Sequence, residues 1–122
     1  MRIGCDIIEI SRIQHFVEQH SAQLIGRVFT QREWDYCQRK ANPYPSFAAR
    51  FAAKEAVAKA FGIGIGEHLN WTSIEVVNNS VGEPEVILDP KGQQLLKNFS
   101  AKTIRISLSH SHDNALAVAI IE

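Results

Sequence analysis

The feature that most constrains the fold is an alanine-rich segment, residues 46–61, which reads SFAARFAAKEAVAKAF. It predicts one long helix. Pro43 and Pro45 stand just before it, and proline lacks an amide hydrogen and biases the preceding residue away from helical geometry, so the helix is expected to begin near Ser46. Glycines follow in the segment 62–66, and a left-handed glycine commonly ends a helix. Both boundaries of the helix are therefore encoded in the sequence.

This helix carries an acid and a base four residues apart, Glu55 and Lys59. At about 100° per residue the two side chains lie about 40° apart, on the side of Ala52 and Ala56. Such a pair is commonly a surface salt bridge that stabilises a helix by a few tenths of a kcal/mol. The neighbouring alanines are small, however, and let another backbone or a ligand approach closely, whereas a solvated face usually carries longer polar side chains. The sequence is therefore compatible with two interpretations of Glu55 and Lys59: a surface salt bridge, or a pair that lines a cleft.

The rest of the chain alternates between short strands and helices, which is an α+β pattern with antiparallel strands and helices packed on one side. We expect strands at 2–8, 72–78, 85–88, 104–108 and after a turn at 112–114, and further helices at 11–25, 30–40 and from Pro90 on. Ser11 is a candidate N-cap, and Thr30 with Glu33 forms a capping box. Residues 2–8 are apolar apart from Asp6, which predicts a buried strand.

Length and composition limit the possible classes. With 122 residues and 45% hydrophobic content, residues 1–122 are expected to form one domain, and an oligomer that buries further apolar surface is compatible with this size. The two cysteines form no CxxC pair and no charged-then-apolar leader precedes them, which favours the cytoplasm. The longest apolar run, residues 115–121, is far shorter than the roughly 20 residues that span a bilayer, so no membrane segment is expected.

Charge is balanced overall but unevenly distributed. The net charge is zero, and residues 1–60 carry nine Lys or Arg against six Asp or Glu, whereas the remainder carries four against seven. This asymmetry suits the docking of an acidic or phosphate-rich partner on the basic half. Basic runs with interleaved aromatic residues are missing, which argues against a nucleic-acid partner.

Asp6 is the unusual residue of the first strand, because a carboxylate among apolar residues is costly unless it is paired or holds a cation. Capping of a neighbouring amide is the alternative. If Asp6 met Glu55, two oxygen ligands without His or Cys would suit Mg²⁺, which takes one or two carboxylates together with phosphate oxygens and water. Lys59, one turn beyond Glu55, would face the same phosphates, an arrangement that serves phosphoryl-type transfer.

The segment SLSHSHDN, residues 107–114, is the second candidate site. In an extended strand His110 and His112 share one face, and Ser109 shares the other with Ser111. Zinc would need a third ligand, which no spacing in the sequence singles out. A polar hairpin end and a phosphate-holding strand end both remain open. The glycines at 62–66 follow a helix rather than a strand, so they match neither a dinucleotide fingerprint nor a phosphate loop.

Three segments together resemble the signature segments of the holo-acyl-carrier-protein synthase family, the short group I phosphopantetheinyl transferases. They are GCDIIEISRI, FAARFAAKEAVAKAFGIGIG and ISLSHSHDNALAVAII, in the family's order and over the whole chain. The resemblance implies the family's α+β fold and the Mg²⁺-dependent transfer of 4′-phosphopantetheine from coenzyme A to a serine of apo acyl carrier protein. Adenosine 3′,5′-bisphosphate is the other product, and the reaction supports fatty acid biosynthesis.

The resemblance also implies roles for individual residues. Asp6 and Glu55 match the metal-binding acids, and Lys59 matches the lysine that contacts the phosphates; these three are the expected catalytic residues. The base that takes the serine proton stays open between Glu55 and a metal-bound water. The remaining expected coenzyme A contacts are the strand-end pair near the nucleotide's phosphate and the glycine loop: Ser109, His110, Gly62, Gly64 and Gly66. Arg50 and Lys54, at the basic positions of the helix motif, are expected either to contact coenzyme A or to support residues that do.

Family members of this length are typically homotrimers with active sites across subunit interfaces, so the resemblance implies the same assembly here. The basic first helix resembles the docking surface for the acidic carrier protein, where Arg12 matches a family arginine and Arg27 and Arg32 are looser matches. Two other functions remain possible: a scaffold that binds nucleotides or carriers without turnover, and a metal-dependent phosphohydrolase that directs water at phosphorus.

Overall fold

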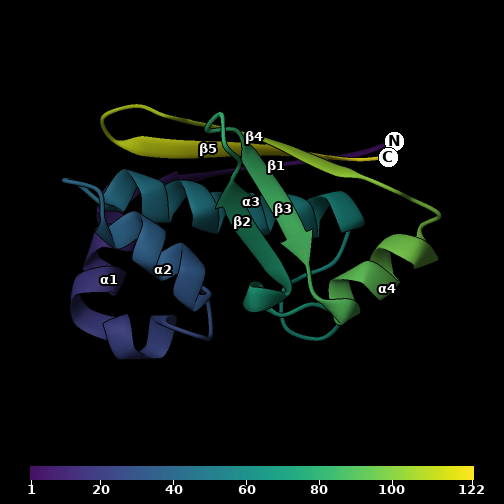
Figure 1. Cartoon of the computed structure of the whole chain (residues 1–122), viewed down its shortest axis with the longest axis horizontal. Helices are drawn as coiled ribbons and strands as arrows, with labels where there is room; N and C mark the ends of the chain where they lie inside the picture. The colour runs from purple at the N-terminus through teal and green to yellow at the C-terminus, as the bar shows by residue number, and fades with distance from the viewer.

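The computed structural model describes all residues, 1–122, and is organised around the long helix α3 (Tyr44–Phe61). Figure 1 shows α3 between a three-stranded sheet on one side and helix α2 with a β-hairpin on the other. Alanine dominates the buried positions of this helix, so neighbouring backbones approach it closely from several sides. Gly62 ends it in the left-handed conformation, with φ of 76°, as the sequence predicts. The helix begins two residues before Ser46, because Pro45 fits the first turn, where a missing amide costs nothing.

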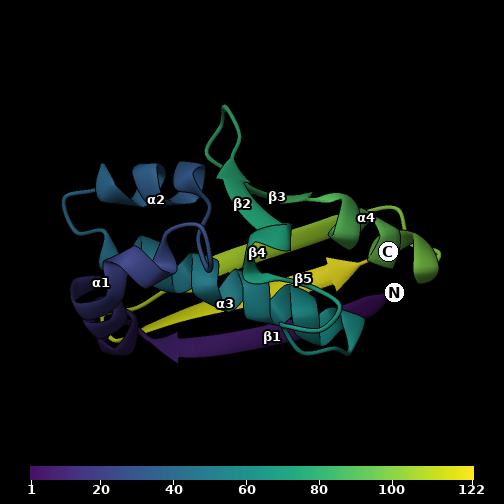
Figure 2. The same cartoon turned by 90° about the horizontal axis from the view of Figure 1, so that it is seen from below.

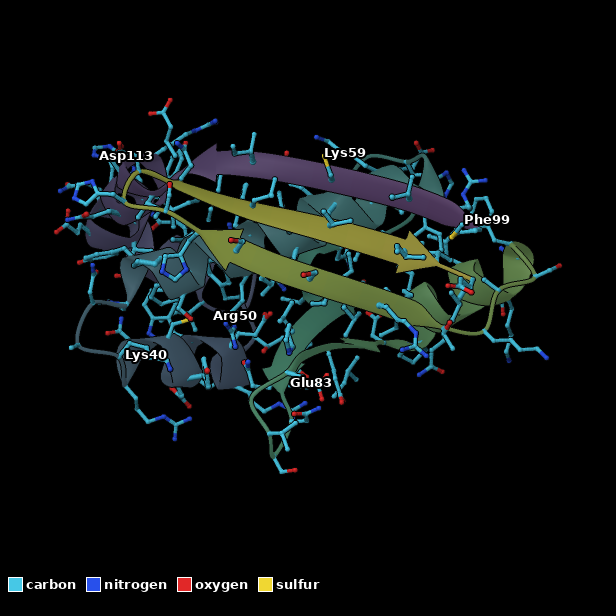
Figure 3. All side chains as sticks on the ribbon, turned by 90° about the horizontal axis from the view of Figure 1, so that it is seen from above. Lys40, Arg50, Lys59, Glu83, Phe99 and Asp113 are labelled. Carbon is cyan, nitrogen blue, oxygen red and sulfur yellow. The ribbon has the colours of Figure 1, made fainter.

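The main sheet has the order β1–β5–β4 and is antiparallel throughout, with β1 at Arg2–Glu9, β4 at Ile104–His110 and β5 at Asn114–Ile121. Its inner face packs on α3. Figure 3 looks down on the outer face, which no helix covers. The prediction that residues 2–8 form a buried strand is therefore wrong for half of the strand: β1 is an edge strand whose alternate side chains Ile3 and Ile7 are 67% and 63% exposed.

The second sheet is the hairpin of β2 (Ile74–Asn78) and β3 (Pro84–Leu88), which confirms the two strands expected around the asparagine- and glycine-rich turn. A short 3₁₀ turn at Trp71–Ser73 precedes it. Helix α4 (Pro90–Asn98) follows β3, and the Asp89 carboxylate accepts from the amide of Gly92 at 2.8 Å. Figure 2 shows the hairpin lying across α3, with its tip projecting away from the body.

Helix α1 (Ile10–Leu24) directly continues β1, and helix α2 (Gln31–Gln38) follows after a short connection. The expected N-cap at Ser11 is wrong, because the helix begins one residue earlier and the amide of Ile10 donates to the Asp113 carbonyl of the β4–β5 turn. The predicted capping box of α2 is present, with reciprocal bonds between Thr30 and Glu33. None of the helices is both long and apolar enough to cross a membrane.

The α+β prediction is confirmed: helices pack against an antiparallel sheet, and elements from both ends of the chain meet at α3. The core is continuous and consists largely of alanine and aliphatic side chains from α3, β5 and β2, closed by the rings of Phe29, Trp34 and Phe47. This arrangement leaves the β1 side of α3 accessible near Glu55 and Lys59.

Candidate active site

The approach of β1 to α3 depends on Gly4. A Cβ atom at this position would lie 2.1 Å from the carbonyl oxygen of Ala56 and 2.6 Å from the amide nitrogen of Ala60, both of them backbone atoms. Only glycine permits that distance between strand and helix. Asp6 is two residues further along β1 and faces the same side, so the close approach brings its carboxylate against α3.

Asp6, Glu55 and Lys59 line one cleft of about 530 Å³, which confirms that the first strand and the alanine helix bring these side chains together. Residues 51, 55 and 59 are one turn apart on α3 and therefore share a face. The cleft runs from β1 past α3 to the start of α1. Its lining residues are Asp6, Ile7, Ile8, Glu9, Arg12, Phe51, Glu55, Lys59 and Asn114.

Lys59 does not form the surface salt bridge that its spacing from Glu55 allowed. Its ammonium group donates to the Asp6 carboxylate at 2.9 Å and to the Cys5 carbonyl at 3.1 Å. The hydrogen bond to Asp6 and the charge of that carboxylate raise the pKa of Lys59, while partial desolvation opposes them. Lys59 is therefore a fixed cation at the edge of β1, where Figure 3 shows it beside the strand.

Glu55 is half-buried and has no cation bonded to it. Burial raises the pKa of the Glu55 carboxyl, the charge of Asp6 raises it further, and Lys59 offsets part of the effect. Two carboxylates that repel each other in a partly desolvated cleft favour a cation between them. They also supply the hard oxygen donors that Mg²⁺ prefers.

No group of three or more His, Cys, Asp or Glu side chains is arranged to hold a metal. Asp6 and Glu55 alone fit a Mg²⁺ ion whose other ligands come from phosphate and water, which is a common arrangement for this ion. The histidines of the β4–β5 turn do not form a zinc site. His112 lies in the turn rather than on the strand, is 99% exposed and bonds Asp113 at 2.9 Å.

Six residues of the cleft were not predicted as part of it, and Phe51, Glu9 and Arg12 are the three that bear on its shape and charge. Phe51 lies one turn before Glu55 on the same face, a spacing that could have indicated its place. Glu9 ends β1 three residues after Asp6, at the junction with α1, and no sequence signal connects it to the cleft. Arg12 was expected only on a docking surface, but it also lines the cleft, because α1 starts directly at the end of β1.

Two residues expected to bind coenzyme A are in the interior. Lys54 is 0% exposed and donates to Glu33 at 2.8 Å, to the Trp71 carbonyl at 3.0 Å and to the Ile74 carbonyl. All three of its protons are therefore used within the fold. The expectation that Lys54 contacts the ligand directly is wrong, because helix α3 is covered by α2 and β2 on that side.

Arg50 is 3% exposed and lies over the Tyr36 ring, with its guanidinium carbon 4.3 Å from the ring centroid. It donates to Ser46 and Asn78, and its buried Nε atom has no partner. Figure 3, which looks down on the main sheet, shows Lys59 at its β1 edge and Arg50 beyond its β4 edge. Within one chain Arg50 therefore does not share the cleft of Asp6 and Glu55.

Ser109 and His110 end β4, which is separated from β1 by the whole width of β5. The pairing of His110 with buried Ala115 directs it to the inner side, and Ser109, opposite exposed Leu116, points to the outer side. Neither side chain lines the cleft of Asp6. The chain thus holds its two predicted phosphate-binding groups at opposite edges of one sheet.

The glycine loop lies beyond the end of α3. Gly66 lines a second, smaller cleft of about 280 Å³ together with Arg27 and Trp71. Gly62 and Gly64 line neither this smaller cleft nor the cleft of Asp6 and Glu55. The rings of Trp71 and Phe51 stack with centroids 4.7 Å apart, and the two clefts share no lining residue but are each lined by one ring of this pair. Arg27 is exposed on the turn after α1.

Comparisons with known proteins show what the chain resembles. A family model described as the 4′-phosphopantetheinyl transferase superfamily matches residues 2–120. The holo-[acyl-carrier-protein] synthase of Chlamydia caviae is 49% identical over 118 residues, which cover 97% of this chain and 93% of that protein. The corresponding protein of Chloroherpeton thalassium is 43% identical over 122 residues, covering 100% and 98%.

Solved structures agree with the sequence matches. The crystal structure of holo-[acyl-carrier-protein] synthase from Neisseria meningitidis superposes with a TM-score of 0.89 at 30% identity, covering 99% of this chain and 97% of that one. The Helicobacter pylori enzyme in complex with coenzyme A gives a TM-score of 0.86 at 29% identity, covering 98% and 99%.

Proposed function

Because the chain belongs to the 4′-phosphopantetheinyl transferase superfamily, we propose that the cleft of Asp6, Glu55 and Lys59 is the place where it modifies acyl carrier protein. The reaction is that of a holo-acyl-carrier-protein synthase: the 4′-phosphopantetheine group of coenzyme A passes to a serine of the apo carrier, and adenosine 3′,5′-bisphosphate leaves. The observation that carries the proposal is the meeting of a fixed ammonium with two carboxylates in one cleft.

Asp6 and Glu55 would hold Mg²⁺, which supplies charge neutralisation and orientation for the diphosphate when it is bound. Lys59 places its ammonium beside the same diphosphate and stabilises the negative charge that develops on the leaving phosphate. The serine oxygen attacks the phosphorus nearer the pantetheine, and the bond from that phosphorus to the oxygen of the bisphosphate product breaks. The Glu55 carboxylate, which lines the same cleft, would take up the serine proton.

The direct test is the mass of an apo acyl carrier protein incubated with the enzyme, coenzyme A and Mg²⁺. A mass increase equal to one phosphopantetheine, with release of one bisphosphate per carrier, supports the transfer. Bisphosphate release without carrier would indicate a phosphohydrolase, and binding of coenzyme A without any release would indicate a scaffold. Each of the last two results contradicts the proposal.

A homotrimer with shared active sites is part of the proposal, and its support is the separation of the two half-sites. The Asp6 cleft lies at the β1 edge of the main sheet, whereas Ser109 and His110 lie at the β4 edge. If both halves contact one coenzyme A, the β4 edge of one subunit must meet the β1 edge of another. Contact between two different surfaces is heterologous, and heterologous contacts close into rings such as trimers.

The uncovered face of the main sheet supports the same assembly. Ile3, Ile7 and Leu116 expose 67%, 63% and 39% of their surface there, and a subunit of this size gains from burying such residues in an oligomer.

We expect Ile7→Asp to convert the trimer to monomer, because a charge in the interface loses its hydration. Light scattering after size-exclusion chromatography measures the mass. Ile87→Asp, an exposed isoleucine on the hairpin, is the matched control and should keep the trimer; an unchanged mass for Ile7→Asp would contradict the interface.

Arg12 and Arg27 are proposed to dock the acidic carrier. We expect Arg12→Glu to raise the KM for the carrier at least tenfold and to raise the KM for coenzyme A less, because the reversed charge repels an acidic helix at the cleft entrance. Steady-state kinetics with each substrate varied in turn measure the two constants. Arg39→Glu, the same charge change at an exposed end of α2, should leave both constants unchanged. An unaltered carrier KM in Arg12→Glu would rule out this docking role.

Residues 1–122 are proposed to act as one transferase domain in the cytoplasm. Both cysteines are free thiols, Cys5 exposed and Cys37 buried, which is compatible with a reducing compartment. Modified carrier protein from this reaction would serve fatty acid biosynthesis.

A further inference from the structure

The most completely bonded charged pair in the chain lies about 100° around α3 from the cleft residue Glu55. Lys54 and Glu33 have fully buried side chains, joined at 2.8 Å. Glu33 also accepts from the amides of Thr30 and Val76, each at 2.9 Å. The pair therefore ties α3 to α2 and to β2 through directional bonds.

The packing of α3 fixes its rotation about its own axis only in part, because few of its buried side chains are large: Phe47 and Phe61 lie near its two ends, and Val57 lies between them. Ala48, Ala49, Ala52, Ala53, Ala56, Ala58 and Ala60 are all buried, so the helix presents small side chains on most of its circumference. Large side chains form the ridges that lock packed helices into one orientation, and an alanine surface lacks them. In the middle of the helix, between the rings of Phe47 and Phe61, the hydrogen bonds of Lys54 then contribute to fixing the rotation.

We infer that the buried Lys54–Glu33 pair is a positioning device for the active site, because it sets the rotation of α3 and thereby the distance of the Glu55 carboxylate from Asp6. This inference rests on the proposed function of the cleft. Lys54 and Glu55 are adjacent in sequence and about 100° apart around the helix. The hydrogen bonds of Lys54 on one side of α3 thus determine the position of the metal-binding carboxylate of Glu55 on another side.

A small rotation of α3 would displace the Glu55 carboxylate far enough to disturb metal binding. With side chains an α-helix has a radius of about 5–6 Å, so a rotation of about 10° moves a side-chain end by roughly 1 Å. Mg²⁺ requires ligand distances of about 2.0–2.1 Å with near-ideal octahedral geometry. A displacement of about 1 Å in a reacting arrangement can cost about a hundredfold in rate.

A buried ion pair is poorly explained by stability alone. Replacing such a pair by uncharged residues of similar size is often neutral or stabilising, because the charges no longer have to be desolvated. Burial lowers the pKa of Lys54, and Glu33 offsets part of that effect, which shows the two opposing influences at this site. Directional alignment is what uncharged residues of the same volume would not supply.

The test uses the intact protein with both charges removed, Glu33→Gln together with Lys54→Met. We expect a folded protein with a lowered melting temperature, because the Trp71 and Ile74 carbonyls lose their donor. We also expect a Mn²⁺ dissociation constant raised at least tenfold and a kcat lowered about a hundredfold. Mn²⁺ binding is measured by electron paramagnetic resonance, independently of activity. The matched control is Arg32→Met with Glu75→Gln: this ion pair also joins α2 to β2, but it has no atom on α3, so Mn²⁺ affinity should be unchanged.

The outcomes separate the two proposals. If wild type neither binds Mn²⁺ nor modifies the carrier, the proposed function fails. If wild type does both and the double variant binds Mn²⁺ as tightly, the positioning role is overturned. Lys54→Gln, which keeps a hydrogen-bonding group beside Glu33, serves as a second variant should the double variant unfold, and the same loss of Mn²⁺ affinity is expected from it. Unfolding of both would overturn the inference as well, since the pair would then be required for the fold itself.

Discussion

Glu55→Gln is expected to lower the rate of carrier modification by about a thousandfold while the fold stays intact. The substitution keeps the shape of the side chain but removes one of the two carboxylates in the cleft. Half of the negative charge that the protein offers to the bound cation is then lost. Losses of this order are typical when a group that stabilises transition-state charge is removed. Carrier mass spectrometry over time, at saturating coenzyme A, measures the rate.

The stability of this variant distinguishes a lost function from a lost fold. Because burial and Asp6 raise the pKa of Glu55, folding disfavours its charged form. The wild type is therefore destabilised by this group above its raised pKa, and it recovers that stability as the pH falls through the raised value toward the ordinary one. Without metal at neutral pH, Glu55→Gln should melt at the same temperature as wild type or higher. Glu67→Gln, an exposed glutamate on a loop, is the control, and near-normal activity in Glu55→Gln would remove the cleft from the mechanism.

Gly4→Ala is expected to have the largest effect on stability, about 3 kcal/mol or more of unfolding free energy, because it overfills a contact between backbones. The added methyl would meet the Ala56 carbonyl at 2.1 Å, and no side chain can move aside to relieve it. Helix α3 must retreat from β1. For a chain of this size the loss corresponds to a fall of roughly 10 °C or more in melting temperature.

The same retreat separates Glu55 and Lys59 from Asp6, so any folded Gly4→Ala protein should also lose Mn²⁺ affinity and at least about a hundredfold in rate. Gly64→Ala is the control for stability, because its added Cβ meets no atom within 4 Å and its backbone is not left-handed. An unchanged melting temperature for Gly4→Ala would mean that strand and helix are not held at this distance in solution.

Much of the fold could be predicted because its signals are local. The prolines before α3, the glycine after it, the capping box of α2 and the Asp89–Pro90 start of α4 each act within a few residues of the boundary that they set. Strand alternation likewise predicted β4, and the alanine- and valine-rich run after the HDN turn predicted β5. The start of α1 was misplaced because its first amide bonds to the Asp113 carbonyl, about 100 residues away in sequence, and no local pattern reports such a partner.

The candidate site was predictable in part for the same reason. Helical spacing places Glu55 and Lys59 on one face, and a lone carboxylate in a strand marks Asp6. Lys54 was misassigned because its burial depends on Glu33, which lies 21 residues earlier and on another helix. In the motif RFAAKEA nothing distinguishes the environment of Lys54 from that of Glu55. Only the packing of α2 and β2 on one side of α3 makes Lys54 a buried residue and leaves Glu55 in the cleft.

The most direct test of the site is a crystal structure of the protein grown with coenzyme A and Mn²⁺, with the ion located by its anomalous scattering. A single ion bound by one carboxylate oxygen of Asp6 and one of Glu55, with Lys59 beside the diphosphate, is the expected result. An ion held elsewhere, or carboxylates of Asp6 and Glu55 that do not contact it in one subunit or across two, would contradict the proposed mechanism.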